Sequence, residues 1–257
     1  MPEIRAGDDL VAILSGALTD LRDGDILVVT SKIVSKAEGA VVHGAGRRDV
    51  IADQAVRVVA ERGETTIVET RHGFVLAAAG VDASNTEPGS LVLLPENPDA
   101  SARRLRAGLG RRRGVGIGVL LSDTFGRPWR NGLTDVCVGA AGLPVLEDHR
   151  GRLDPYGNRL DASVTATADE IASAAELVKG KLTGIPVALV RGLGHLVTAA
   201  DGPGVRPLIR PAAEDLFRLG TREAMLGAVS ARRTVREFAA APVDPEAVRR
   251  AVAAAVT

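Results

Sequence analysis

Residues 25–30 read DILVVT, an unbroken run of apolar, mostly branched side chains between an aspartate and a threonine. Such a run is typical of a strand that is covered on both faces. A second run, GVGIGVLL over residues 114–121, has the same character and leads into Ser122, Asp123 and Thr124. Because active-site residues on sheets tend to follow strand ends, we expect a functional site just past these strands.

Weaker patterns on either side of these strands predict further elements. We expect residues 30–39 (TSKIVSKAEG) to form a polar loop, and residues 49–61 a helix with Val58 and Val59 facing inward. The remaining expected strands are 65–70, 74–79, 90–94 and 186–193, with a hairpin turn at 71–73, and the remaining helices are 8–21, 99–112, 167–178, 211–229 and 246–256. This irregular mixture predicts an α/β or α+β class with more than one sheet.

Two of the predicted helices have recognisable starts. Asp8 can cap the helix over 8–21. Thr167 and Glu170 have the spacing of a capping box at the start of the helix over 167–178.

The bulk composition excludes several classes of protein. The chain has 257 residues, which suits one large domain or two small ones, and 32 basic residues balance 32 acidic ones. Zero net charge argues against a chain-wide nucleic-acid or acidic-lipid binder. The lone Cys137 excludes a disulfide framework and lies in an apolar run, so we expect it to be buried. The apolar runs are too short to span a bilayer and the N-terminus is polar, so we expect a soluble cytoplasmic protein without contacts to membrane or nucleic acid.

The lysines are confined to two short segments, although the chain contains 28 arginines. Lys32 and Lys36 lie in TSKIVSK, and Lys179 and Lys181 lie in KGKLTGIP. Ammonium groups combined with serine and backbone N–H groups suit phosphate oxygens, although the P-loop spacing is absent. The alternative is a set of solvated lysines, with Lys179 favoured by the dipole of the preceding helix.

Two acidic segments are candidates for a metal site. In GVDASN (80–85), Asp82 can supply oxygen to a hard cation such as magnesium, or can form an Asx-turn with its own backbone. In SDTFGRPWRNG (122–132), Asp123 and two arginines accompany Trp129. The alternative there gives Asp123 to a helix cap and Trp129 to the core.

Six longer motifs resemble one known family. They are DGDILVVTSKIVSKAEG, AAAGVDASN, LLSDTFGRPWRNG, DPYGN, TADEIASAAELVKGKLTGIPVALVRGL and AEDLFRLGT. In order and spacing they resemble the coenzyme F420-0:γ-glutamyl ligases, and more closely the N-terminal ligase domain of the actinobacterial bifunctional form. The resemblance covers residues 1–229. Residues 230–257, beginning SARRTVREF, resemble the opening of a nitroreductase-like FMN domain that we expect to be truncated here, so FMN is expected only with that complete domain.

The resemblance implies a two-subdomain α+β fold with mixed sheets and packed helices, usually a homodimer. It implies a GTP-dependent ligase that adds L-glutamate to the terminal carboxylate of coenzyme F420-0, or its dehydro form, through an acyl phosphate. The enzyme then extends a γ-linked polyglutamate tail, using magnesium or manganese and potassium. The alternative is a non-catalytic nucleotide- and metal-binding module that dimerises and supports a flavin reductase domain.

The family's functional residues carry over to three groups in this sequence. Asp82, Asp123 and Thr124 match the family's metal ligands. We predict Asp123, Lys36 and Arg127 to be catalytic, where Arg127 and Arg130 are our own hypotheses for holding carboxylates. The expected GTP contacts are Met1, Pro2, Glu3, Ile4, Ser31, Lys36, Asn85, Lys179, Gly180, Lys181, Leu182, Thr183, Gly184, Ile185 and Pro186.

Overall fold

The computed structural model describes residues 1–211, 214–215, 226, 228–229 and 244–256. It divides into two units, Met1–Ile209 and Arg210–Thr257, each of which is treated by itself. In the second unit α7 (Pro245–Val256) confirms the helix expected near the end of the chain. Most of the helix predicted over 211–229, and the whole SARRTVREF segment, lie outside the described residues. The domain boundary expected after residue 229 therefore stays a prediction.

A four-stranded mixed sheet with the order β11-β1-β7-β8 forms the centre of the first unit. Its strands are β1 (Ile26–Thr30), β7 (Gly118–Arg127), β8 (Arg130–Ala141) and β11 (Val187–Val190). β1 and β7 run parallel, with Thr30 opposite Ser122, whereas the other two pairings are antiparallel. The two apolar runs of the sequence are therefore neighbours, and their carboxyl ends meet at one edge of the sheet.

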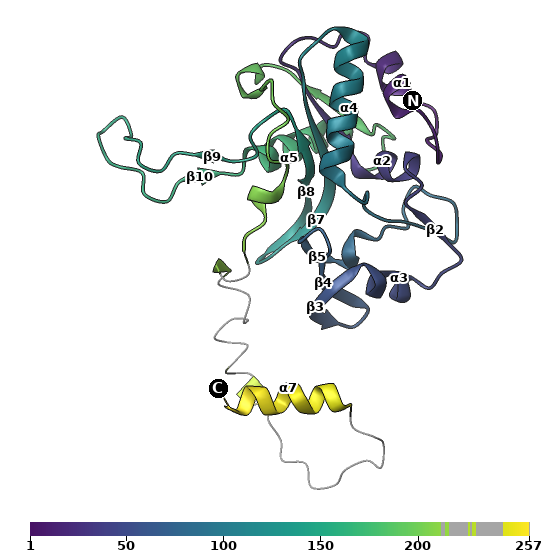
Figure 1. The fold of residues 1–257 in the computed structure, drawn as a ribbon, viewed down its shortest axis with the longest axis vertical. Coiled ribbons are helices and arrows are strands. Elements are labelled where there is room, and N and C mark those ends of the chain that lie inside the picture. Colours follow the sequence, from purple (N-terminus) through teal and green to yellow (C-terminus); the bar gives the residue numbers. More distant parts are fainter. Residues whose placement is uncertain (212–213, 216–225, 227, 230–243, 257) are drawn as a thin grey trace. The chain divides into compact units, whose positions relative to one another are not determined.

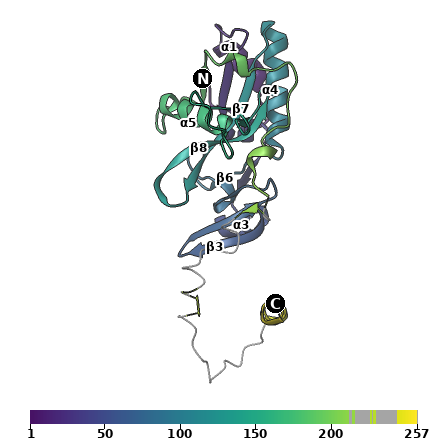
Figure 2. The same cartoon turned by 90° about the vertical axis from the view of Figure 1, so that its left-hand side faces the viewer.

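Two helices cover the opposite faces of this sheet, as Figure 2 shows. α4 (Pro98–Arg113) buries Ala102, Leu105 and Leu109, and α5 (Thr167–Lys179) buries a face of small residues with Ile171. α4 is packed so tightly on β8 that a Cβ on Gly139 would lie 2.7 Å from the backbone of Pro98. The main hydrophobic core lies between these layers.

A second, smaller core confirms the two-part α+β arrangement. It contains Val50, Ile51, Val68, Ala79, Val81 and Leu91. The three-stranded sheet of β3 (Ala55–Arg62), β4 (Thr65–Thr70) and β5 (Val75–Ala77) and the helix α3 (Arg47–Gln54) surround it, together with a two-stranded sheet of β2 (Val41–His43) and β6 (Ser90–Val92). Figure 1 shows this part below the central sheet.

The remaining elements are short. They are α1 (Leu10–Ala17), α2 (Ser31–Ala37), β9 (Glu147–Asp148), β10 (Val164–Thr165) and the 3-10 turns Ala78–Gly80, Gly194–Leu196 and Arg206–Leu208. β9 and β10 pair at the base of an arm that projects from the body in Figure 1. Among the described helices, none combines the length and apolarity that crossing a membrane would require.

The segment expected to be a polar loop is a helix instead. After β1 the chain turns directly into α2, which buries Ile33 and Val34 against the main core. The apolar pair is too short to show a helical period in the sequence, so the four polar residues around it suggested a loop. The helix has a consequence for the lysines, because Lys32 and Lys36, four residues apart, share one helical face.

The helix expected over 49–61 ends early and gives way to a strand. α3 stops at Gln54, and β3 begins at Ala55 and pairs with β4. Val58 and Val59 were expected inside but are 54% and 41% exposed. Their β-branched side chains favour an extended backbone, and pairing with β4 decided the outcome.

Both predicted helix caps were wrong in detail. Asp9, not Asp8, caps α1 by accepting a hydrogen bond from the backbone N–H of Ala12 at 2.9 Å. α5 has Ala166 at its cap position, without a side-chain hydrogen bond there. Asp169, in its first turn, instead accepts from the backbone N–H of Cys137 at 2.8 Å and so links α5 to β8. Cys137 is buried, as expected.

Candidate functional site

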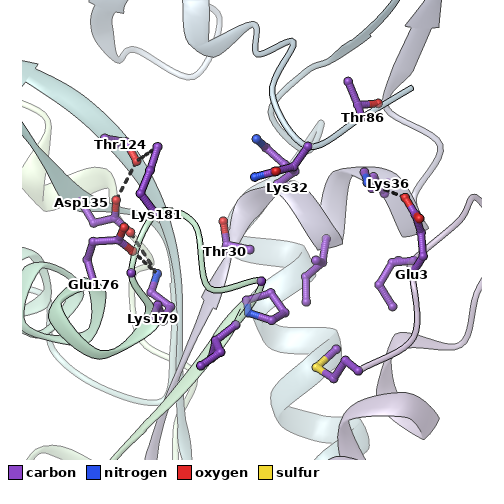
Figure 3. A pocket seen from close by; sticks show the side chains of 18 of the residues that line it. Glu3, Thr30, Lys32, Lys36, Thr86, Thr124, Asp135, Glu176, Lys179 and Lys181 are labelled. Atoms are coloured by element: carbon purple, nitrogen blue, oxygen red, sulfur yellow. Dashed lines mark hydrogen bonds and ion pairs between the residues drawn. The ribbon is translucent and has the colours of Figure 1, made fainter. Parts of the chain in front are cut away.

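A pocket of about 670 Å³ opens where β1 and β7 end, and all four lysines of the chain line it. Figure 3 shows Lys32 and Lys36 on one side and Lys179 and Lys181 on the other, with Thr30 between. The N-terminal residues 1–4 and residues 85–87 complete its wall. We call this cavity the lysine pocket. Two segments that are far apart in the sequence, helix α2 and the end of α5 with the loop after it, meet here because the parallel β1–β7 pairing and the neighbouring β11 bring them to one edge of the sheet.

The two lysines of α2 are held by carboxylates. The Lys32 ammonium donates to Asp82 Oδ2 at 2.5 Å and to both the carbonyl and the hydroxyl of Ser84 at 2.8 Å. The Lys36 ammonium lies 3.3 Å from Glu3 Oε1. Their side chains are only 17% and 15% exposed, so both charges form part of the pocket wall.

Lys179 is buried and already paired with a carboxylate, unlike a phosphate-binding lysine on an exposed loop. It is the last residue of α5, and its side chain is 3% exposed. Its ammonium donates to Asp135 Oδ2 at 2.9 Å and to Ser122 Oγ at 2.8 Å. Lys181, by contrast, is exposed and donates to Thr124 Oγ1 at 3.2 Å.

Asp135 on β8 lines this pocket and was not among the site residues predicted from the sequence. Its carboxylate accepts hydrogen bonds from Ser122 at 2.9 Å, Thr124 at 2.8 Å and Lys179. Burial raises the pKa of Asp135. The hydrogen bond and charge of Lys179, with the hydrogen bonds from Thr124 and Ser122, lower it by more, so the pKa lies below its ordinary value. An acidic residue within an alternating strand is a recognisable signal, but residues 130–141 were not predicted to form a strand.

Asp82 and Asp123 have opposite electrostatic surroundings. Asp82 Oδ1 accepts from the backbone N–H of Ser84 at 2.7 Å, which confirms the Asx-turn. Burial raises the pKa of Asp82, but the bonds from Lys32 and Ser84 lower it by more. Burial raises the pKa of Asp123 to about 7, and the negative charges of Asp135 and Asp82 add to this effect.

These oxygens fit a divalent cation. Within the described part of the chain, no three His, Cys, Asp or Glu side chains are grouped closely enough to hold a metal ion by themselves. Magnesium, however, usually takes only one or two protein carboxylates and completes its shell with water and substrate phosphates. The negative charges of Asp135 and Asp82, which help to raise the pKa of the half-buried Asp123, are of the kind that a bound cation would offset. An ion at Asp82 would have to replace the ammonium of Lys32.

The structure brings most of the predicted GTP contacts to the pocket, but not all. The predicted residues that line it are Met1, Pro2, Glu3, Ile4, Lys36, Asn85, Lys179, Gly180, Lys181, Gly184, Ile185 and Pro186. Ser31 is instead buried at the start of α2, next to Thr30, which does line the pocket. Leu182 is 95% exposed, and neither it nor Thr183 is part of the lining.

Arg127, predicted to be catalytic, lies at the end of the β7–β8 hairpin. Its guanidinium donates to the carbonyl of Asn131 at 2.6 Å, and it is exposed outside the pocket lining. The purely structural alternative for residues 122–132 was wrong on both of its points. Asp123 lies within β7 rather than at a helix cap, and Trp129 is 74% exposed rather than packed in the core.

Comparisons of the sequence with known proteins identify a family. The family model described as F420-0:Gamma-glutamyl ligase matches residues 1–47 and 44–192. A protein of Methanopyrus kandleri named "Coenzyme F420:L-glutamate ligase" is 40% identical over 237 residues, which cover 84% of this chain and 94% of the relative. Proteins with the same name from Methanothermobacter thermautotrophicus and Methanocaldococcus jannaschii are 39% and 36% identical, covering 85% of this chain and 96% and 94% of the relatives.

The matches to the relatives extend over almost the whole of each relative, and the match to the family model includes both lysine segments of the pocket. The family resemblance inferred from the six motifs is confirmed, whereas the closer resemblance to the actinobacterial bifunctional form stays a prediction. The chain belongs to the F420-0:γ-glutamyl ligase family.

Proposed function

We propose that this protein joins L-glutamate to the terminal carboxylate of coenzyme F420-0, or its dehydro form, with hydrolysis of GTP to GDP and phosphate. It then adds further glutamates through γ-linkages. Membership in the family, and the printed name of its relatives, support glutamate ligation to this coenzyme. The use of GTP is our inference from the pocket.

One observation carries this inference. The four lysines of the chain, from two distant segments, all line a single pocket. A triphosphate carries several negative charges, and ammonium groups in a partly buried wall attract it more strongly than solvated ones do. In this structure the ammonium groups of Lys32 and Lys36 contact carboxylates, so phosphate oxygens would replace Asp82 and Glu3 as partners.

The position of each side chain in the pocket suggests which part of the substrate complex it would bind. Lys32 and Lys36 on α2, with the backbone of Gly180 and Lys181, would bind the phosphates. Asp82, Asp123 and Thr124 would hold magnesium or manganese. When bound, the ion neutralises phosphate charge and orients the γ-phosphate. Potassium and a homodimer remain predictions that accompany this assignment.

The reaction then needs no protein nucleophile. A carboxylate oxygen of the coenzyme attacks the γ-phosphorus, the bond from that phosphorus to the bridging oxygen breaks, and GDP leaves. The amine of glutamate attacks the resulting acyl phosphate at its carbonyl carbon. Inorganic phosphate departs as the amide forms, and the nitrogen loses one proton. Arg127 and Arg130, exposed on the β7–β8 hairpin, stay hypotheses for holding a carboxylate of either substrate.

A direct assay tests this proposal. The purified chain is incubated with GTP, magnesium or manganese, potassium, L-glutamate and coenzyme F420-0. We expect GDP release and a mass increase of the coenzyme by whole glutamate residues. Folded protein that binds GTP but adds no glutamate would instead support the non-catalytic module. Folded protein that neither binds GTP nor adds glutamate would refute both.

A further inference from the structure

We propose that Asp135 is a positioning residue for the divalent cation, acting through Thr124. It accepts the hydrogen bond of the Thr124 hydroxyl and thereby presents that oxygen to the pocket as an acceptor. The inference rests on the metal site of the proposed function and adds to it a residue that is not among the predicted metal ligands or GTP contacts. Asp135 and Lys179 would together form a fixed support behind the ligands.

The donor and the acceptor of each hydrogen bond to Asp135 can be assigned. An ionised carboxylate accepts only, so Ser122, Thr124 and Lys179 must each donate to it. The carboxylate is 4% exposed, and the Lys179 ammonium 2.9 Å away compensates its charge.

The Thr124 hydroxyl therefore uses its only proton in the hydrogen bond to Asp135. It has one proton, and that proton points at Asp135 Oδ1, 2.8 Å away. Only lone pairs remain for the pocket, and these suit a cation rather than a phosphate oxygen. The contact with Lys181 agrees with this polarity, because an ammonium group at 3.2 Å can only donate to Thr124 Oγ1.

A purely structural role for Asp135 is the competing explanation, since its pair with Lys179 also joins α5 to the sheet. The two roles differ in metal affinity. Partners that orient metal ligands typically contribute about 10–100-fold to metal binding. The Asp135→Asn substitution keeps the shape, but its amide brings donor hydrogens and breaks the all-acceptor pattern at Thr124 and Lys179.

The experiment measures the affinity for Mn²⁺ alone by calorimetry on the full chain, with unfolding stability recorded in parallel. We expect Asp135→Asn to weaken Mn²⁺ binding at least tenfold. Thr124→Val should weaken it similarly, whereas Thr124→Ser, which keeps the hydroxyl, should restore it. In the Thr124→Val background, adding Asp135→Asn should cause little further loss, because the two residues act as a unit.

Asp169→Asn is the matched control, because Asp169 also bridges α5 and β8 but through the backbone of Cys137. It should leave Mn²⁺ affinity unchanged. Unchanged affinity in a folded Asp135→Asn, or fully additive losses in the double variant, would overturn the inference. If Asp135→Asn does not fold, unchanged affinity in Thr124→Val overturns it as well. Failure of the wild-type chain to bind Mn²⁺ would refute instead the metal site of the proposed function.

Discussion

Replacing Lys179 by methionine removes the positive charge from the most buried ion pair of the pocket. The Lys179 and Asp135 side chains are 3% and 4% exposed, and 2.9 Å separates the ammonium from the carboxylate. Methionine fills similar space, so the main effect is an uncompensated buried carboxylate that keeps only Ser122 and Thr124 as donors. Breaking a buried pair in this way costs about 3–5 kcal/mol. This is a large fraction of the roughly 5–15 kcal/mol that stabilises a typical domain.

Urea unfolding monitored by circular dichroism measures this cost as a change in the free energy of unfolding. For a slope of about 2 kcal/mol per molar urea, a loss of about 4 kcal/mol lowers the midpoint by about 2 M. Arg57→Met is the control, because the Arg57–Glu69 pair is 43% and 31% exposed and should contribute less than about 1 kcal/mol. Asp135→Asn added to Lys179→Met should recover part of the loss, since the buried charge of Asp135 is then removed as well.

The pH dependence of Lys179→Met has a definite sign. In the wild type, Lys179 holds the pKa of Asp135 below its unfolded value, so that contribution persists until the pH falls below about 4. Without Lys179, burial dominates and raises the pKa of Asp135, so protonation stabilises the folded variant. Its deficit relative to wild type should therefore shrink as the pH falls toward about 4, the ordinary pKa of an aspartate in the unfolded chain. A loss below about 1 kcal/mol, equal to that of Arg57→Met and independent of pH, would refute this account of the pair.

Four further outcomes follow from the structure. Lys36→Ala should weaken GTP binding about tenfold or more in calorimetry, because it removes a charged donor from the pocket wall, whereas Arg103→Ala on α4 should not change it. Asp123→Asn should abolish glutamate addition, followed by mass spectrometry, while the thermal midpoint stays near wild type; retained activity would remove Asp123 from the metal site. Asp25→Asn should destabilise the fold by about 1.5–3 kcal/mol at pH 7, because the Arg191 guanidinium donates two 2.8 Å bonds to this buried carboxylate. Since Arg191 holds the pKa of Asp25 below its ordinary value, that difference should disappear in unfolding experiments as the pH falls below about 4. Gly139→Ala should cost about 1–3 kcal/mol in urea unfolding, because its Cβ would lie 2.7 Å from the Pro98 backbone; a neutral effect would contradict the close packing of α4 on β8.

The central strands and the long helices were predictable because their signals are local. The apolar runs at 25–30 and 114–121 became the parallel pair β1 and β7, and the period over 99–112 became α4. Elements with mixed signals were not predictable. Val58 and Val59 fit the inward stripe of a helix over 49–61 as well as a β-strand, and only pairing with β4 distinguished the two.

Some features of the site were likewise predictable from the sequence, and others were not. The confinement of lysine to two short segments is visible in the sequence alone, and these segments form both walls of the pocket. The sequence could not show that Lys179 is buried, because its charge suggested exposure and its partner Asp135 lies 44 positions away. It also placed Arg127 among the catalytic residues, whereas the hairpin carries that side chain outside the pocket lining.

The sequence by itself determined the class of the fold, the family and the residue types available for chemistry, since these depend on composition, local periodicity and motif order. Only the tertiary structure decided which charges neighbour one another and which way each hydrogen bond runs. Coulomb energy and desolvation depend on distances across β1, β7, β8 and α5, and chain order does not encode those distances locally. For this reason Asp135, which no sequence motif singled out, forms one polar network with Thr124 and Lys179 in the folded protein.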